Sequence, residues 1–413
     1  MKFNFDEIID RKGTNSSKWD NCNNIFGRED ILPMWVADTD FKAPIEVIDA
    51  MRNRLEHGIY GYTFRSESYN ESIINWVKKR HNWDIKSEWI TFSPGVVPAI
   101  SMAIQTFTYP GDKVIIQPPI YPPFHSVVES SGRVKIENEL SYRDGKYYMD
   151  IEKLEEQIKT VDISYTNNNN GVNNHFDDRV KLLLLCNPHN PSGRVWTKEE
   201  LLRIGKICTD NNILIVSDEI HSDIIYKGHK HIPIASLSEE LAQCTITCIA
   251  PSKTFSLAGL TTSAVIIPNE KLRNMYNNTL ETLEIDGGNI FGSVALETAY
   301  REGEEWLDEL LVYLEDNLKY LMNYFKDNIP EIKPVCPEAT YLVWLDCSEL
   351  GLEGRDLMDF FVNEAKVGLN PGTRFGEKYG KFARLNIGCP REILKEGLSR
   401  IEKAVKRYES NRR

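Results

Sequence analysis

One apolar run, Leu182-Leu183-Leu184-Leu185-Cys186, constrains the fold of this chain more than any other stretch. Because successive side chains of a strand point to opposite faces, an uninterrupted apolar run predicts a strand that is buried on both faces. Similar runs recur at 213–216 and 245–249, and a helical pattern at 197–211 separates the first two runs. Strands that alternate with helices are typical of an α/β fold, in which a mostly parallel sheet lies between helices.

The remaining patterns predict the domain organisation. We expect an N-terminal arm with part of a small domain at 1–48, a large α/β domain at 49–288, and a linking helix with the small domain at 289–413. The linking helix is predicted over 293–328 with a kink near Gly303, and the small domain as an α+β unit. The asparagine-rich segment 166–178 cannot bury apolar area and is interpreted as a solvated surface insertion.

Composition disfavours several classes of function. The formal net charge is -12 and there is no long basic run, which disfavours binding to nucleic acid or to an anionic membrane. No apolar run is long enough to span a bilayer, and the mixed, acidic N-terminus does not resemble a secretory signal. The eight cysteines lack the spacing of metal ligands, so we expect no metal site. These features predict a reduced, cytoplasmic protein with a small-molecule ligand.

Four polar side chains follow predicted strands, directly or within a short turn. They are Tyr121 after the strand at 113–117, Asn190 after Cys186, Asp218 after the strand at 213–216, and Lys253 after the strand at 245–249. Ligands of open α/β sheets bind beyond the carboxyl ends of the strands. We therefore expect these four side chains to converge on one ligand.

Lys253 lies in Ala250-Pro251-Ser252-Lys253-Thr254-Phe255, just after a predicted buried strand. Lysine is rarely buried without a partner, and desolvation makes its amine easier to deprotonate. Such an amine is suited to Schiff-base chemistry with a carbonyl group. The alternative interpretation is a surface lysine in a loop.

Three further positions allow both a binding and a structural interpretation. The amides around Gly95, at the start of a predicted helix, suit an anion, although every helix needs a cap. Tyr121, in a proline-rich loop, can stack on a flat aromatic ligand or pack beneath its own loop. Arg384 interrupts an apolar strand and demands an anion, which is either a structural acid or a substrate carboxylate.

Taken together, these positions resemble the fold-type I pyridoxal-phosphate (PLP) enzymes of the class I/II aminotransferase superfamily. Within it, three phrases resemble the MalY/PatB-type cystathionine β-lyases: Met34-Trp35-Val36-Ala37-Asp38, Ser217-Asp218-Glu219-Ile220-His221-Ser222-Asp223 and Ala250-Pro251-Ser252-Lys253-Thr254-Phe255. The resemblance covers nearly the whole chain. It implies a homodimer that cleaves the C–S bond of cystathionine or a related L-cysteine S-conjugate, giving a thiol, pyruvate and ammonia.

The resemblance also implies roles for cofactor-binding residues. Lys253 would link to the cofactor and then act as the base on the substrate's α-proton, with Asp218 on the pyridine nitrogen and Tyr121 on the ring face. The other implied cofactor contacts are Asn190 at the phenolic oxygen, His221 beside the cofactor, and Gly95, Val96, Val97, Ser252 and the neighbouring subunit's Tyr62 at the phosphate.

For the substrate, the resemblance implies that Arg384 clamps the carboxylate, with contributions from Asn190, Ala37 and Tyr62. Two departures bear on the reaction. Aminotransferases of this superfamily usually carry a tyrosine where this chain has His221, and an arginine where it has Leu260. Both differences favour the lyase over the alternative, a PLP-dependent aminotransferase. A regulatory role through protein contacts is a further alternative that no sequence feature favours.

Overall fold

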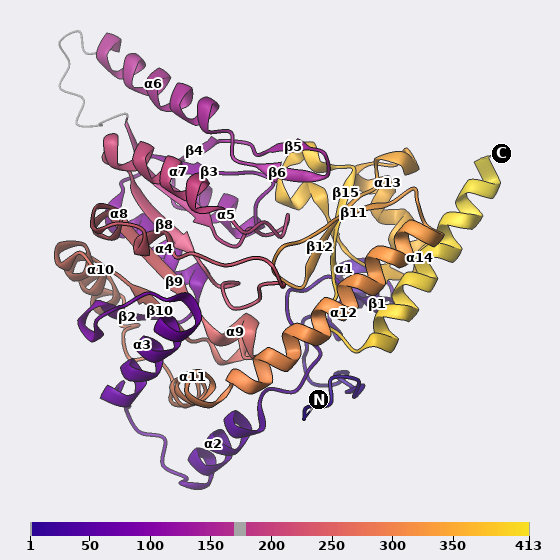
Figure 1. Cartoon of the computed structure of the whole chain (residues 1–413), viewed down its shortest axis with the longest axis horizontal. Coiled ribbons are helices and arrows are strands. Elements are labelled where there is room, and N and C mark those ends of the chain that lie inside the picture. The colour runs from indigo at the N-terminus through magenta and orange to yellow at the C-terminus, as the bar shows by residue number, and fades with distance from the viewer. Residues whose placement is uncertain (1, 169–178, 413) are drawn as a thin grey trace.

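The computed structural model describes residues 2–168 and 179–412, and a central sheet occupies the middle of the larger part of the molecule (Figure 1). The strand order of this seven-stranded sheet is β2-β10-β9-β8-β7-β3-β4. Its strands are β2 (Ile90–Ser93), β3 (Lys113–Ile116), β4 (Val134–Glu137), β7 (Val180–Cys186), β8 (Leu214–Asp218), β9 (Thr245–Ile249) and β10 (Ser263–Ile266). Neighbouring strands are parallel, except that β10 runs antiparallel to β9 and β2. The predicted mostly parallel sheet is confirmed.

The two faces of β7 explain why its apolar run is continuous. Leu182 and Leu184 pack in one cluster with side chains of α4 (Val96–Phe107), α5 (Pro122–Ser130) and α10 (Glu270–Thr282). Leu183 and Leu185 pack in another cluster with side chains of α6 (Ile151–Asn168), α7 (Lys198–Asp210) and α8 (Glu239–Cys244). Alternate side chains therefore fill two separate cores, and the prediction of a strand buried on both faces is confirmed.

A second, four-stranded antiparallel sheet lies in the C-terminal part of the chain. Its order is β11 (Lys333–Val335), β12 (Leu342–Asp346), β15 (Phe382–Asn386) and β14 (Asn370–Pro371). The helices of this region are α12 (Glu304–Asn328), α13 (Gly354–Asp359) and α14 (Arg391–Arg412), and Figure 1 shows α12 and α14 side by side. The α+β organisation agrees with the prediction, whereas the domain boundaries at 48 and 288 stay predictions.

The predicted linking helix is two helices, α11 (Ile290–Glu302) and α12, with Gly303 between them. The Gly303 amide donates to the Ala299 carbonyl at 2.8 Å. A Cβ atom at Gly303 would lie 2.5 Å from that carbonyl oxygen and 2.5 Å from a ring atom of Phe255. Close packing therefore requires glycine here, and the chain breaks where the kink was predicted.

The N-terminal part of the chain contacts both sheet regions. It contains α1 (Cys22–Phe26), β1 (Leu32–Pro33), α2 (Ile45–Glu56) and α3 (Glu67–His81), and β1 pairs in parallel with β13 (Val367–Gly368) of the C-terminal part. A separate hairpin joins β5 (Ser141–Arg143) to β6 (Lys146–Tyr148).

Two predicted loops differ from their expected extent. The proline-rich loop at 118–124 is shorter than expected, because α5 begins at Pro122, and proline suits the first turn of a helix. In the polar segment, 166–168 belong to the end of α6, and 169–178 lie outside the described residues. The interpretation of that segment as a surface insertion stays a prediction.

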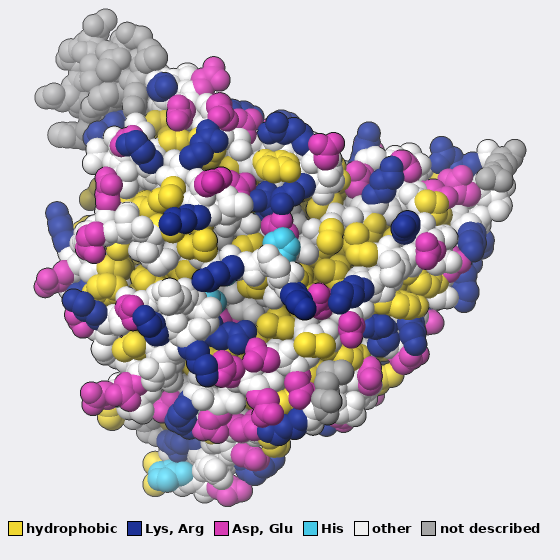
Figure 2. Space-filling model, viewed as in Figure 1, with side chains coloured by type: hydrophobic (Ala, Val, Ile, Leu, Met, Phe, Trp, Pro, Cys, Tyr) yellow, Lys and Arg dark blue, Asp and Glu magenta, His cyan; other side chains and the backbone are white. Residues whose placement is uncertain are grey.

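The surface carries mixed charges. Figure 2 shows Lys and Arg side chains interspersed with Asp and Glu side chains over the face that it displays. Across residues 2–168 and 179–412, we found no helix with the length and apolar character that crossing a membrane requires.

Replacing Leu184 by alanine should destabilise the central sheet. This side chain is 0% exposed, so its truncation leaves a cavity and should cost about 2–5 kcal/mol in the free energy of unfolding. The matched control is Leu202→Ala in α7, where the leucine is 38% exposed and the loss should stay below about 1 kcal/mol. Urea unfolding followed by circular dichroism measures both, and equal losses would contradict the assigned core.

Candidate active site

A cavity of about 190 Å³ lies where β7, β8 and β9 end and α4 begins. It brings together every site residue that the sequence predicted, except Tyr62 and Arg384. The residues lining it are Ala37, Pro94, Gly95, Val96, Val97, Pro98, Tyr121, Cys186, Asn190, Asp218, Ile220, His221, Ser252, Lys253, Ala258, Thr261 and Thr262. A larger hollow of about 470 Å³, beside His125 and Lys378, is lined by none of the predicted site residues.

Lys253 lies on α9 (Pro251–Thr254), a single turn that begins two residues after β9. Its side chain reaches the cavity, and its Nζ donates to the Ala37 carbonyl at 2.6 Å. Burial lowers the pKa of Lys253 to about 8, although the carboxylates of Asp38 and Asp218 oppose this shift. The interpretation as a surface lysine is therefore excluded, and the amine can lose its proton far more easily than an exposed lysine.

Asp218 ends β8 and lies almost fully buried at the same cavity. Its Oδ1 accepts a hydrogen bond from the Ile220 amide at 3.1 Å. Burial raises the pKa of Asp218 to about 7, and the positive charge of Lys253 partly opposes this shift. A cationic N–H donor in the cavity would favour the ionised carboxylate and satisfy its remaining oxygen.

Arg384 extends from β15, so it brings the C-terminal sheet to the site. Its guanidinium donates to Asn190 Oδ1 at 2.9 Å and to the Trp35 carbonyl at 3.0 Å. No described acid acts on its charge, its Nε has no described hydrogen-bond partner, and burial lowers its pKa to about 10. Arg384 therefore does not pair with a structural acid among the described residues. This buried cation next to the cavity can instead bind an anionic ligand.

Two more side chains shape the wall of the cavity. Tyr121 is the residue just before α5, and burial raises the pKa of its hydroxyl. His221 is almost fully buried, its Nδ1 has no described hydrogen-bond partner, and burial lowers its pKa to about 3. The imidazole is therefore neutral near pH 7. It does not replace the positive charge of the arginine that aminotransferases usually carry at the position of Leu260.

The start of α4 provides a site for an anionic group. Gly95 is the residue before the helix, and the first helical amides, from Val96 and Val97, have no partner within an α-helix. These residues and Ser252 line the cavity together. Among the described residues of its lining, Lys253 alone carries a positive charge near pH 7, so a phosphate here would rely mainly on backbone amides.

Sequence reasoning assigned no role to several residues that the structure brings to the site. The Tyr341 hydroxyl donates to the Ala37 carbonyl at 3.1 Å, and Asp38 exerts the strongest charge effect on Lys253. The only signal was the pair of acids, Asp38 and Asp40, between aromatic residues. Tyr62 is fully exposed and lies outside the cavity of its own chain, so its assigned role stays a prediction.

Comparisons with known proteins agree with this geometry. Residues 30–401 match the family described as aminotransferase class I and II. Cystathionine beta-lyase PatB of Bacillus subtilis (strain 168) is 44% identical over 402 residues, which cover 97% of this chain and 100% of that protein. A PLP-bound protein of Clostridium difficile 630, provisionally named an aminotransferase, has a TM-score of 0.92 and 48% identity, with 98% of this chain and 100% of that chain covered. The PLP-bound C–S lyase of Staphylococcus hominis has a TM-score of 0.88 and 33% identity, with 98% of each chain covered.

The fold and the cavity define a PLP-dependent enzyme of fold-type I. This chain belongs to the class I and II aminotransferase family. The residues present fit the cofactor: an amine of lowered pKa suits its aldehyde, the buried Asp218 suits its pyridine nitrogen, and the free amides of α4 suit its phosphate.

Asp218→Asn should change how the stability of the cofactor-free protein depends on pH. Because burial raises the pKa of Asp218 from 3.8 to about 7, the folded state holds a proton that the unfolded state releases, and stability falls as pH rises through this range. The asparagine variant has no carboxyl group to titrate, so it lacks this loss. The difference in melting temperature, variant minus wild type, should therefore increase between about pH 4.5 and about pH 8. Differential scanning fluorimetry measures the difference, and a constant offset across the range would contradict the assignment.

Proposed function

We propose that this protein is a PLP-dependent C–S lyase that acts on cystathionine or a related L-cysteine S-conjugate. The observation that carries the proposal is that Lys253 and Asp218 line one cavity, while Arg384, which pairs with no described acid, lies beside it and donates to Asn190 of its lining. Asp218 suits the pyridine nitrogen of the cofactor, Lys253 suits removal of the α-proton, and Arg384 suits the substrate carboxylate. The 44% identity to cystathionine beta-lyase PatB over the full length of that protein supports this substrate class.

The cofactor would be held by residues from four parts of the chain. Lys253 would bind its aldehyde carbon and Asp218 its pyridine nitrogen, while Asn190 and Tyr121 would contact the ring. The amides of Gly95, Val96 and Val97, together with Ser252, would bind the phosphate, with His221 nearby. When bound, PLP withdraws electron density from the Cα atom of an amino acid and so makes its proton removable.

The chain's own groups then act on the substrate. Arg384 binds its carboxylate, with Asn190 and the Ala37 segment beside it, and so orients the Cα–H bond. Lys253 Nζ takes the α-proton, which its lowered pKa allows. The electron pair of the Cα–H bond then forms the Cα–Cβ double bond, and the Cβ–S pair leaves with the sulfur, which is protonated to a thiol. Water completes the balance by converting the remaining enamine fragment to pyruvate and ammonia.

Transamination is a second candidate, because a structure with 48% identity is provisionally named an aminotransferase. It would require the proton to return to the cofactor and a keto acid to accept the amino group. The neutral His221 and the uncharged Leu260 stand where aminotransferases usually carry Tyr and Arg, so these residues favour elimination.

The assay of the purified protein with cystathionine tests the function directly. Wild type should absorb visible light because the cofactor is attached to Lys253, and it should release a thiol and pyruvate without an added keto acid. Lys253→Ala should lose the absorption band of the attached cofactor and reduce kcat by at least about 1,000-fold, since both attachment and proton removal need this amine. A strict requirement for a keto acid would favour the aminotransferase, and full activity of Lys253→Ala would overturn the mechanism.

We also propose that the protein is a homodimer, in which Tyr62 reaches the site of the neighbouring subunit. Support comes from an exposed apolar stretch over 59–64, where Ile59, Tyr60, Tyr62 and Phe64 are all exposed. So many exposed large apolar side chains in one short segment are typical of an interface.

Phe64→Glu should weaken this dimer, because an interface of this type would have to bury the new carboxylate. Sedimentation velocity should show a dimer for wild type and a larger monomer fraction for the variant. Tyr62→Phe should leave the dimer intact while weakening cofactor retention, since only the hydroxyl is lost. A wild-type monomer that retains cofactor would contradict both roles.

A cytoplasmic location is the third part of the proposal. All eight cysteines are free, which suits a reducing compartment. Cell fractionation with an antibody against the chain tests this location.

A further inference from the structure

The backbone segment that accepts the Lys253 hydrogen bond has no regular secondary structure. We call residues 35–40 the crossing segment; it passes between the C-terminal sheet and the cavity. Its Ala37 carbonyl accepts from Lys253 Nζ at 2.6 Å and from the Tyr341 hydroxyl at 3.1 Å. Because this carbonyl contacts the reactive amine, the position of the crossing segment determines where that amine points.

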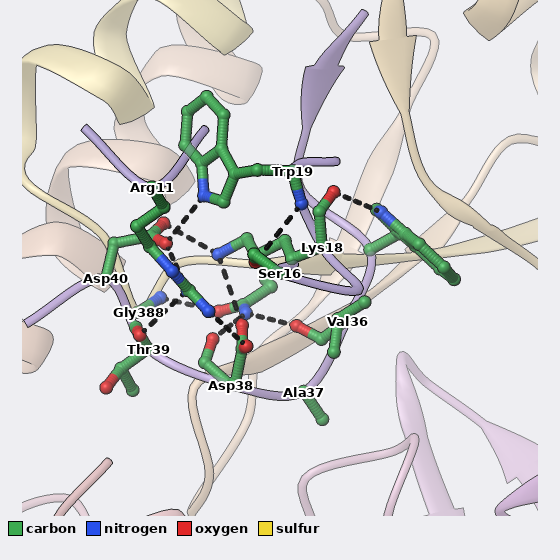
Figure 3. Close-up of polar contacts among 12 residues, drawn as sticks. Arg11, Ser16, Lys18, Trp19, Val36, Ala37, Asp38, Thr39, Asp40 and Gly388 are labelled. Atoms are coloured by element: carbon green, nitrogen blue, oxygen red, sulfur yellow. Dashed lines mark hydrogen bonds and ion pairs between the residues drawn. The ribbon is translucent and has the colours of Figure 1, made fainter. Parts of the chain in front are cut away.

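The C-terminal part of the chain holds one side of the crossing segment. Asn386 Nδ2 donates to the carbonyls of Val36 and Asp38 at 2.6 Å and 2.7 Å. The Asp40 amide donates to the Gly388 carbonyl at 2.9 Å (Figure 3). These bonds hold the backbone of the crossing segment, but they do not involve the carboxylates of Asp38 and Asp40.

The N-terminal arm supplies those partners. Figure 3 shows Arg11 and Lys18 directed at Asp38 and Asp40. Arg11 bridges the two acids, at 2.8 Å from Asp38 Oδ2 and 2.7 Å from Asp40 Oδ1. Lys18 lies 2.7 Å from Asp40 Oδ2 and 3.8 Å from Asp38 Oδ1, and its side chain is 1% exposed. Trp19 Nε1 adds a hydrogen bond to Asp40 Oδ1 at 3.0 Å.

The burial of this cluster distinguishes it from ordinary surface ion pairs. Exposed pairs contribute little to structure, whereas a buried lysine must keep its partner, because an unpaired buried charge is costly. Two cations and two carboxylates balance in charge, so the cluster is neutral as a unit. It therefore allows very few positions for the crossing segment.

We propose that Arg11 and Lys18 are positioning residues for the lyase reaction, because their ion pairs with Asp38 and Asp40 hold the Ala37 carbonyl against the Lys253 amine. Neither cation lines the cavity, so both act through the crossing segment. The inference rests on the proposed function for its kinetic readout, and on the cofactor-free protein for an independent one.

Arg11→Gln is the primary variant, since glutamine keeps a donor and avoids stranding a deeply buried acid. Its kcat for cystathionine should fall about 10- to 100-fold, which is the scale of a misplaced catalytic group, while KM should change less than about threefold. Lys18→Met is the second variant. If it folds, its kcat should fall in the same way, with little change in KM. Glu7→Gln is the matched control: it removes an exposed pair, Lys42–Glu7 at 2.6 Å, that also joins the arm to the residues after the crossing segment.

A second measurement follows Lys253 without the cofactor. Competitive labelling of its amine with acetic anhydride, read by peptide mass spectrometry, gives the pH midpoint of its titration. The charged or titratable groups around this amine are Asp38, Asp218, Arg384, His221 and Tyr341. Asp38→Asn removes the strongest charge effect on Lys253, so the midpoint should move to lower pH by about one unit, whereas Glu7→Gln should not move it.

The two readouts separate the possible failures. Folded Arg11→Gln and Lys18→Met proteins with wild-type kcat would overturn the positioning role. A wild-type labelling midpoint in Asp38→Asn would contradict the charge effect of Asp38 on Lys253, and with it the link between the crossing segment and this amine. A wild-type protein that cleaves no C–S conjugate, but whose Lys253 labelling responds as expected, would overturn the proposed function and support the link between the crossing segment and Lys253.

Discussion

The withdrawal of Lys253 from water is the constraint on which the rest of the structure depends. An amine is useful as a base near neutral pH only if its charged form is disfavoured, and burial lowers the pKa of Lys253 to about 8. A buried amine in turn needs a hydrogen-bond acceptor, which the Ala37 carbonyl provides at 2.6 Å. The cavity keeps the Lys253 amine partly desolvated, and the crossing segment with its acids directs that amine.

Three distant parts of the chain meet that requirement together. The parallel strands β7, β8 and β9 end at the same edge of the sheet, which places Asn190, Asp218 and Lys253 around one cavity. The antiparallel β15 brings Arg384 from the C-terminal sheet, and the N-terminal arm fixes the crossing segment between them. The site therefore exists only when both sheets and the arm are packed, which couples folding to function.

Local pattern predicted much of this arrangement. Mostly apolar runs identified β7, β8 and β9, because a strand buried on both faces has few polar positions, and the polar residues at or after their ends marked the site. Pattern failed where partners lie far apart in sequence. It did not decide whether Arg384 pairs with an acid, and it gave Arg11, Lys18 and Tyr341 no role, since nothing near them in the sequence shows what they contact.

By itself, then, the sequence determined the α/β class, the strand ends that carry the reactive groups and the chemistry of those groups. These depend on side-chain periodicity and residue type, which are local properties. Only the tertiary structure decided the shape of the cavity, the acid-free environment of Arg384 and the ion pairs that hold the crossing segment. Desolvation and charge pairing depend on every neighbouring atom in space, and those neighbours come together only when the chain has folded.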